Sequence, residues 1–266
     1  MESPTIQVLC FFYNEETLAR LFLRHYAYAD NIHAVVSRST DRTLEVLQSA
    51  PNVTIEPFEF PMGMDDILKT EKVNAWLAAR SEFDWQIVVD ADEFVWPSLH
   101  NCYFNDEFIG KIVNGFRTKE YLRGIPPEVS VLWAKMKNVF RHETEADLDL
   151  NLPPALQRRH GDPNQYSAGN AQYCKPVIIR ANQCVRLGLG NHELTSGHPP
   201  GEAQWFEGAH WQNADPAFAL TRRLRDRRDR QSQRNRQLGL GQQHHHIREE
   251  DVLRVCQANR SCPQLF

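Results

Sequence analysis

Apolar residues in the first hundred positions form short runs that alternate with longer amphipathic segments. The runs are rich in β-branched and aromatic residues, and the segments between them repeat apolar residues at helical spacing. Strands are predicted at 5–13, 32–37, 53–60 and 85–91, and helices at 14–30, 39–50 and 64–81. This alternation predicts an α/β fold with a mostly parallel central sheet and helices on both faces.

The pattern changes in the second half of the chain. It predicts a helix at 104–115, strands at 129–140 and 203–212, and a pair of strands at 171–181 and 183–189. Residues 142–170 are polar and rich in Pro, Asn and Gly, which indicates a long irregular insertion of the kind that is usually functional or mobile. A helical tail begins near 216 and ends in a short helix at 248–258. We therefore divide the chain into a domain at 1–215, with halves at 1–100 and 101–215, and a helical extension at 216–266.

Three carboxylates, Asp90, Asp92 and Glu93, stand at the end of the buried strand at 85–91. Ligands of parallel sheets bind at such strand ends. Neighbouring carboxylates repel each other, and a site that keeps both ionised usually holds a cation. The pattern predicts a Mg²⁺ or Mn²⁺ ion that presents a phosphate-bearing substrate. The alternative is that one aspartate caps the next element and the others face water.

Composition narrows the class of protein only a little. The chain has 266 residues, is 41% hydrophobic and carries a net charge of -4, so it can bury a sizeable core and has no global nucleic-acid signature. Its apolar runs are too short to span a bilayer, and its N-terminus lacks the features of a signal peptide. The six cysteines include no CxxC pair, which favours thiols in a reducing compartment over a disulfide framework. We expect a cytoplasmic protein.

The segment 222–236 contains eight arginines and two aspartates. We interpret it as a solvated helix with i,i+4 pairs such as Arg222–Asp226 and Arg225–Asp229. The alternative is peripheral contact with the anionic inner face of a membrane or with a lipid-linked acceptor. Nucleic-acid binding is not expected, because aromatic residues do not interleave with the basic ones.

Several stretches together resemble family 2 glycosyltransferases of the GT-A fold, and more closely their subgroup with a DxDEF signature. The first-half stretches are "CFFYNEETLARLFLRHY", "SRSTDRTLEVL" and "VVDADEFVWP". In the second half, "CKPVIIRANQCVRLGLGNHEL" is similar to a lysine-containing strand that leads to a histidine, and "GAHWQNADPAFALTRRLR" to a later histidine followed by a helix. The likeness spans roughly residues 5 to 230.

The resemblance implies a GT-A fold in which 1–100 bind a nucleotide-sugar donor and 101–215 bind an acceptor. The implied reaction is metal-dependent transfer of a sugar, with inversion, to a hydroxyl of a glycan or lipid-linked acceptor in glycan or polysaccharide synthesis. At the end of the first strand, where the family packs the nucleoside, stand Phe12, Tyr13, Asn14 and Glu15. Ser37 replaces an aspartate that usually contacts the base, which leaves the nucleotide open. Asp41 keeps a second acidic position of the family, although it is equally suited to cap the next helix.

The resemblance also assigns the charged residues. Asp90 matches a ribose or metal contact and Asp92 the principal metal ligand, while Glu93 matches a structural contact. Lys72 would face the donor phosphates, with a solvated lysine as the alternative. Lys175 would neutralise the departing diphosphate or pair with a nearby acid.

Two late histidines, His192 and His210, match the family position at which a histidine completes the metal shell or touches the diphosphate. Imidazole suits manganese as a further ligand. We choose His192 first, because the glycines before it allow close approach to a ligand, and His210 second. The expected metal set is therefore Asp90, Asp92, His192 and His210. The adjacent histidines 244–246 are not expected to converge on one ion.

The sequence does not single out the base that an inverting transfer requires. Glu193, beside His192, is the first candidate, followed by Asp65, Asp66 and Asp215. An apolar platform for a sugar ring is a further expectation, with core packing as the alternative. The residues concerned are Trp205, Phe206 and Trp211.

Two other functions remain open. A sugar-phosphate nucleotidyltransferase would normally carry a Gly-rich phosphate loop after the first strand, and "FFYNEE" has none. A non-catalytic nucleotide-sugar-binding domain is the other alternative, because Ser37 departs from the family pattern.

Overall fold

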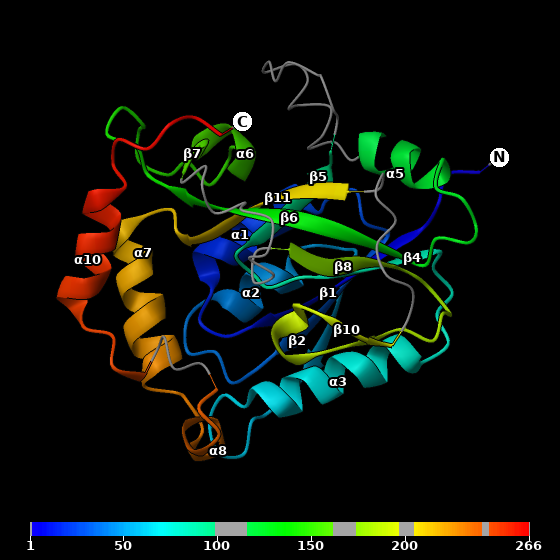
Figure 1. Ribbon diagram of the computed structural model, residues 1–266, viewed down its shortest axis with the longest axis horizontal. Helices are drawn as coiled ribbons and strands as arrows, with labels where there is room; N and C mark the ends of the chain where they lie inside the picture. Colours follow the sequence, from blue (N-terminus) through cyan, green and yellow to red (C-terminus); the bar gives the residue numbers. More distant parts are fainter. Residues whose placement is uncertain (1, 99–115, 162–173, 197–204, 241–244, 266) are drawn as a thin grey trace.

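The computed structural model describes residues 2–98, 116–161, 174–196, 205–240 and 245–265, and its centre is one curled mixed sheet (Figure 1). The strands of this sheet are β1 (Ile6–Phe12), β2 (Asn31–Val36), β3 (Val53–Pro57), β4 (Trp85–Val88), β5 (Glu93–Pro97), β6 (Val131–Phe140), β7 (His160–Gly161), β8 (Cys174–Arg180) and β11 (Trp205–Asn213). A separate small sheet is formed by β9 (Arg186–Leu187) and β10 (Leu194–Ser196).

The helices follow the predicted alternation in the first half and gather at the C-terminal end in the second. They are α1 (Glu16–His25), α2 (Thr43–Gln48), α3 (Asp66–Ala78), α5 (Phe116–Arg123), α6 (Pro154–Gln157), α7 (Pro216–Thr221), α8 (Gln233–Gln237) and α10 (Glu249–Ala258), with a 3₁₀ turn η3 (Leu189–Asn191) and a π-helix η4 (Arg222–Arg228).

The strand order of the central sheet is β3-β2-β1-β4-β8-β6-β11-β5, with β7 beside β6. The first four strands pair in parallel. β8 is antiparallel to both β4 and β6, so β6 points the same way as β4, and β11 is parallel to β6. Six of the described strands therefore share one direction, while β5, β7 and β8 run the opposite way. This confirms the predicted α/β class with a mostly parallel sheet.

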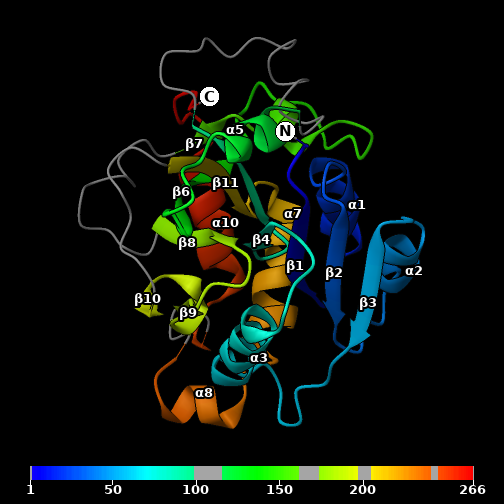
Figure 2. The same ribbon diagram turned by 90° about the vertical axis from the view of Figure 1, so that its right-hand side faces the viewer.

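Helices cover both faces of the parallel half, as predicted (Figure 2). Alternate residues of β1 point to opposite faces. Val8 packs in the core that includes Phe22 of α1, whereas Leu9 packs in the cluster that includes Val73 and Leu77 of α3. The apolar runs of the sequence are thus buried on both sides, because α1 and α2 cover one face and α3 covers the other.

Three local predictions are corrected by the structure. β4 ends at Val88, and a turn leads into β5, which pairs antiparallel with β11. β8 and β9 do not pair with each other, because β8 lies between β4 and β6 while β9 pairs with β10. The helix predicted at 14–30 begins only at Glu16, since the φ of Asn14 is 50° and its Oδ1 accepts a hydrogen bond from the Thr40 amide (2.7 Å). The predicted helix at 104–115 lies outside the described residues.

The described part of the segment at 142–170 is more ordered than its composition predicts. It carries α6 and β7, and the buried Arg158 donates from Nε to the Ala214 carbonyl oxygen (2.8 Å) and from Nη1 to that of Ala146 (3.1 Å). The chain end is also tied to this segment, because the Leu265 amide donates to the Arg159 carbonyl oxygen (2.7 Å).

The predicted helical segment begins at Pro216, and its helices pack against one another. Val252 and Cys256 of α10 are buried with Ala219 of α7, and Ile247 joins the same cluster. α7 runs directly into the π-helix η4, so this packing fixes the position of the arginine-rich segment. Among the residues that the structure describes, no helix is both long and apolar enough to cross a membrane.

Candidate active site

The turn between β4 and β5 places the predicted carboxylates. The Asp90 amide donates to Glu93 Oε2 (3.0 Å), and the Glu93 amide donates to the Asp90 carbonyl oxygen (2.9 Å). Glu93 is 2% exposed, and its other carboxylate oxygen accepts a hydrogen bond from Lys175. Glu93 therefore holds the turn and Lys175 together, in agreement with the structural contact expected for it.

Asp90 lies between two lysines. Its Oδ1 accepts from Lys69 of α3, and its Oδ2 lies 3.9 Å from Lys175 Nζ. Burial acts to raise the pKa of Asp90, but these two ammonium groups outweigh it and hold the pKa below its ordinary value. Asp90 is therefore an ionised carboxylate whose charge is balanced by nearby cations of the chain, first of all Lys69 and Lys175.

Asp92 is fully buried at the centre of a larger ionic cluster. Its Oδ2 accepts from Arg222 and lies 3.1 Å from His210 Nε2 and 3.8 Å from Arg227 Nη2. Its Oδ1 has no hydrogen-bond partner within the described part of the chain. Burial acts to raise the pKa of Asp92, but Arg222 and His210 hold it well below its ordinary value.

His210 is held on its other side by Asn138, whose Oδ1 lies 2.7 Å from Nδ1 of the ring. If Nδ1 donates to Asn138, a neutral ring turns the lone pair of Nε2 toward Asp92. A proton or a metal ion between the two groups would satisfy that arrangement. Strand pairing keeps the two side by side, because His210 is in register with Glu93 and the Trp211 amide donates to the Asp92 carbonyl oxygen (2.7 Å).

The arginine-rich segment enters this site, which the sequence analysis did not predict. Arg222 is 5% exposed and bridges Asp92 and Glu15, donating from Nε to Glu15 Oε1 (2.7 Å). Arg222 and Arg227 both approach Asp92, because a π-helix brings residues five apart toward one face. The expected partner of Arg225, Asp229, bonds to Arg228 instead (2.7 Å). The sequence gives no signal that selects Arg222 and Arg227, because two other arginine pairs of the segment have the same i,i+5 spacing.

A cavity of about 590 Å³ joins these groups to an aromatic wall. Its charged end holds Asp90, Glu93, Lys69, Lys175, Arg222, Arg227, His192 and His210, and its aromatic end holds Phe11, Tyr13, Ser37, Phe60 and Arg230. Asp92 does not itself line the cavity, although Arg222, Arg227 and His210, which contact it, do. Carboxylates, cations and aromatic rings thus converge on one space at the carboxyl ends of β1 and β4.

The cavity brings together about half of the residues that the sequence singled out. The predicted residues that line it are Phe12, Tyr13, Glu15, Ser37, Asp66, Asp90, Glu93, Lys175, His192 and His210. Burial raises the pKa of Glu15 to about 7 against the opposing effect of Arg222. Burial likewise raises the pKa of Asp66, the one predicted base candidate among the described lining residues.

Other predicted residues have different partners. Lys72 bonds to Glu56, and Lys69, one helical turn earlier, faces the cavity instead. Asp41 accepts from the amides of Thr43 (3.0 Å) and Glu16 (3.1 Å), the first residues of α2 and α1, and it is not among the described residues that line the cavity.

The remaining base candidates also serve the fold. Glu193 packs so closely against Gly188 that a Cβ added to this glycine would lie 2.4 Å from Cγ of Glu193. Asp65 and Asp215 cap α3 and α7. Phe206 and Trp211 are wholly buried, so they pack the core and cannot serve as a sugar platform. The side chain of Trp205 lies outside the described part of the structure.

His192 lines the cavity but does not complete a metal cage. Burial and then Lys175 lower its pKa to about 4, so its ring is neutral at physiological pH. Its Nδ1 is buried without a partner among the described residues. Across those residues no group of three or more His, Cys, Asp or Glu side chains is arranged to hold a metal ion. The expected set of four ligands is therefore not gathered at one point.

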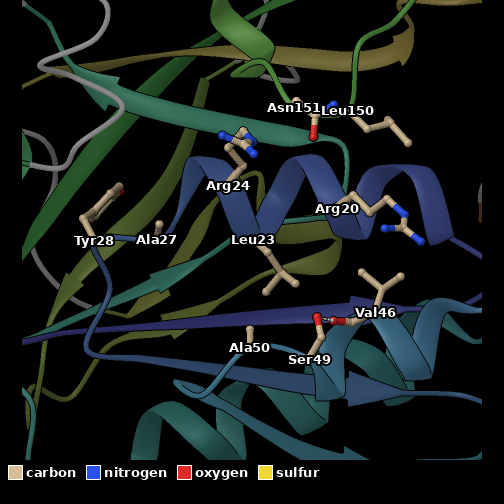
Figure 3. Close-up of a pocket in the computed structure, with 10 residues that line it drawn as sticks. All are labelled: Arg20, Leu23, Arg24, Ala27, Tyr28, Val46, Ser49, Ala50, Leu150 and Asn151. Carbon is tan, nitrogen blue, oxygen red and sulfur yellow. Dashed lines mark hydrogen bonds between the residues drawn. The ribbon is translucent and has the colours of Figure 1, made fainter.

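A second cavity, of about 610 Å³, lies against α1 (Figure 3). It is formed by α1, the end of α2 and the segment around Asn151, and it includes Arg20 and Arg24. No carboxylate, histidine or cysteine is among its described lining residues, and Arg20 bonds to Glu16 (3.1 Å). It lacks the convergent acid and base groups of the first cavity.

No protein-family model and no curated protein matches the chain. Among solved structures, the chain is similar to glucosyl-3-phosphoglycerate synthase from Mycobacterium tuberculosis in complex with Mn²⁺, uridine diphosphate and glucosyl-3-phosphoglycerate, with 18% identity over 51% of this chain and 44% of that one and a TM-score of 0.29. It is also similar to 4-diphosphocytidyl-2C-methyl-D-erythritol synthase from Anaerococcus prevotii, with 9% identity over 66% and 70% of the two chains and a TM-score of 0.30. The chain thus matches less than half the length of the mycobacterial synthase. Likeness of this extent does not assign a reaction.

Proposed function

We propose that this protein is a glycosyltransferase that moves a sugar from a nucleotide-sugar donor to an acceptor hydroxyl. The observation that carries the proposal is the meeting of the carboxylate turn with four cations, Lys69, Lys175, Arg222 and Arg227, in one cavity that also has an aromatic end. A nucleoside diphosphate is complementary to these two ends: its negative diphosphate would contact the cations, and its flat base would contact the aromatic rings. Parallel-sheet proteins bind such ligands at this edge.

The described protein groups of this site are too few to bind a divalent ion by themselves. The ion would bind together with the diphosphate, which would supply its remaining ligands. The buried Oδ1 of Asp92 has no partner among the described residues, and His210 Nε2 lies 3.1 Å from the other oxygen, Oδ2. Mg²⁺ or Mn²⁺ commonly takes one or two protein ligands and completes its shell from substrate phosphates. Asp92 and His210 would hold the ion. When bound, it would act as a Lewis acid on the departing diphosphate.

The chain's own cations have a defined part in the proposed transfer. The bond between the sugar and the diphosphate breaks as negative charge accumulates on the leaving group. Lys69, Lys175 and Arg227 face the cavity and are oriented before any substrate binds, so they would stabilise that charge without reorganisation. Asp66 lines the cavity and has a raised pKa, and unlike Glu15 it is not bonded to Arg222, so we assign to Asp66 the proton of an acceptor hydroxyl. The acceptor, a glycan or a lipid-linked sugar, remains part of the proposal.

The decisive experiment measures binding of a nucleoside diphosphate by calorimetry with and without MnCl₂. We expect manganese to tighten binding to the parent protein by about tenfold or more, and Asp92→Asn to abolish that gain, because the ion loses an anionic ligand. Asp147→Asn is the matched control, since this carboxylate is 91% exposed and is not among the described residues that line the cavity.

Each outcome decides part of the proposal. Equal manganese dependence in Asp92→Asn and the parent protein would reject Asp92 as a ligand. Tight binding that does not depend on manganese would reject a role for the metal ion and would indicate that the cations of the cavity alone bind the diphosphate. Incubation with a panel of nucleotide sugars should release a nucleoside diphosphate; release of pyrophosphate from a nucleoside triphosphate would instead favour nucleotidyl transfer.

A further inference from the structure

The two ends of the cavity differ in chemistry, and Lys69 marks the boundary between them. Its ammonium group bonds to Asp90 and lies 5.6 Å from the centre of the Phe11 ring. Beyond Phe11, the Phe60 ring follows at 6.4 Å between centroids. A diphosphate at the charged end would therefore direct the base of the same nucleotide toward these rings. Rings of this kind accept any base, because every base has a face that can stack.

Discrimination between bases requires polar groups, and Arg230 supplies them at the aromatic end. Its guanidinium carbon lies 3.1 Å from the centre of the Tyr13 ring, and its Nη2 donates to Ser37 Oγ (3.3 Å). Tyr13 ends the first strand region and Ser37 the second, so Arg230 spans the two strand ends from the C-terminal segment. Stacking on Tyr13 keeps the plane of the guanidinium fixed.

The backbone of Arg230 is also held in place. The Met64 amide donates to the Arg230 carbonyl oxygen (2.6 Å), and the Ser232 amide donates to the Met64 carbonyl oxygen (3.0 Å). Gly63 has a φ of +90°, and a Cβ there would lie 2.4 Å from the Arg230 carbonyl oxygen. The close approach therefore depends on glycine. Arg230 is thus a built part of the cavity and not a loosely placed surface side chain.

The hydrogen-bonding character of this pair determines which base it suits. A guanidinium is a donor only, and its fork matches two adjacent acceptors, as in the pairing of arginine with O6 and N7 of guanine. Cytosine offers a similar pair in O2 and N3. Uracil places an N–H between its carbonyl groups, and adenine places an amino group beside N7. Neither Arg230 nor Ser37 carries the carboxylate that would accept such an N–H group.

We propose that Arg230, stacked on Tyr13 and bonded to Ser37, selects a donor whose base presents two adjacent hydrogen-bond acceptors, namely a guanosine or cytidine diphosphate sugar. This inference rests on the proposed function. It assigns to Arg230 a role in specificity and none in the chemical step.

The test compares the affinities of GDP, CDP, UDP and ADP for the parent protein and for Arg230→Lys. We expect GDP or CDP to bind at least about tenfold more tightly than UDP and ADP, the discrimination that one good bidentate pair gives. Arg230→Lys keeps the charge and loses the fork, so the ranking should flatten while the mean affinity changes little. Ser37→Asp adds an acceptor and should shift the preference toward UDP. Arg234→Gln, a neighbouring arginine whose side chain is 50% exposed, is the control and should keep the parent ranking.

The outcomes separate this inference from the proposed function. If none of the four diphosphates binds, both fail. If they bind with equal affinity, or if UDP or ADP binds most tightly, the proposed function stands and the role of Arg230 is rejected. A ranking that survives unchanged in Arg230→Lys would also reject it, and thermal unfolding of each variant would show that the fold is intact.

Discussion

His25 shows how one buried titratable residue links the fold to pH. It is 1% exposed, its Nε2 lies 3.1 Å from the Val95 carbonyl oxygen, and burial lowers its pKa to about 4. The folded protein therefore keeps the ring neutral, while the unfolded chain takes up a proton near pH 6.5. Its contribution to stability is complete above that pH and is lost as the pH falls toward 4, by about 3 kcal/mol in total.

We therefore expect His25→Gln to lose less unfolding free energy than the parent protein between pH 7 and pH 4.5. Urea unfolding at several pH values measures the difference, and the slope with pH, rather than the absolute stability, is the readout. His246→Gln, at an exposed ring, should keep the parent slope. A parent-like slope in His25→Gln would show that another group carries the pH dependence.

At the same scale, the sequence identified the carboxylates more readily than their partners. Asp90 and Asp92 could be predicted because a short acidic motif follows a buried strand. The choice between Lys72 and Lys69 could not, because both lie on α3 and the rotation of that helix against β1 and β4 decides which lysine faces the cavity. Asp41 could not be resolved either, since a capping carboxylate and a ligand-binding one look the same in the sequence.

At the scale of elements, the π-helix η4 changes the meaning of the arginine-rich segment. Amphipathic templates assume 3.6 residues per turn, and on that basis the pairs Arg222–Asp226 and Arg225–Asp229 were expected. The i,i+5 hydrogen bonding of η4, as between the Asp229 amide and the Leu224 carbonyl oxygen (3.1 Å), realigns the helix so that Arg222 and Arg227 face the cavity. Local sequence does not reveal such a departure.

Arg227, which lines the cavity, should contribute to anion binding, whereas the exposed Arg225 on the same π-helix should not. Arg227→Gln removes a cation from the cavity, and we expect affinity for a nucleoside diphosphate to fall by about 10- to 100-fold, as for the loss of a charge-assisted hydrogen bond. Arg225→Gln makes the same change on an exposed position of the same π-helix. Calorimetry on both variants at one salt concentration tests this, and an equal loss in both would indicate general electrostatic attraction in place of a specific contact.

At the scale of the whole molecule, the alternation of strands and helices predicted the parallel half of the sheet and its two helical layers. The other half could not be predicted, because β8 inserts between β4 and β6, and β5 pairs with β11, through contacts between residues far apart in the chain. The domain at 1–215 and the extension at 216–266 remain a proposed division. Arg222 lies in the proposed extension, yet it is bonded to Asp92 and Glu15 in the proposed domain.

Because Arg222 is positioned by the packing of the C-terminal helices, a substitution that disrupts the core contact of α10 should also weaken ligand binding in the cavity. Val252 is fully buried against α7, which continues into η4, whereas Leu253 beside it is 41% exposed. Val252→Ser should lower the melting temperature and weaken nucleoside diphosphate binding, because the support of η4 is loosened. Leu253→Ser should change neither. Reduced melting temperature with unchanged binding in Val252→Ser would indicate that the helical tail and the cavity are energetically separate.

The contact between Asp92 and Arg222 also has a consequence for the order in which the protein matures during synthesis. The two residues are 130 positions apart, and His210, the other close partner of Asp92, is also distant in the chain. An ionised carboxylate is costly to bury without a counter-charge. While residues after about 210 are still to be synthesised, the turn that follows β4 therefore cannot adopt its final buried form without protonation or exposure of Asp92. The segment that carries His210 and Arg222 thus completes the burial of Asp92, and a chain that has not yet reached this segment keeps an unfinished cavity.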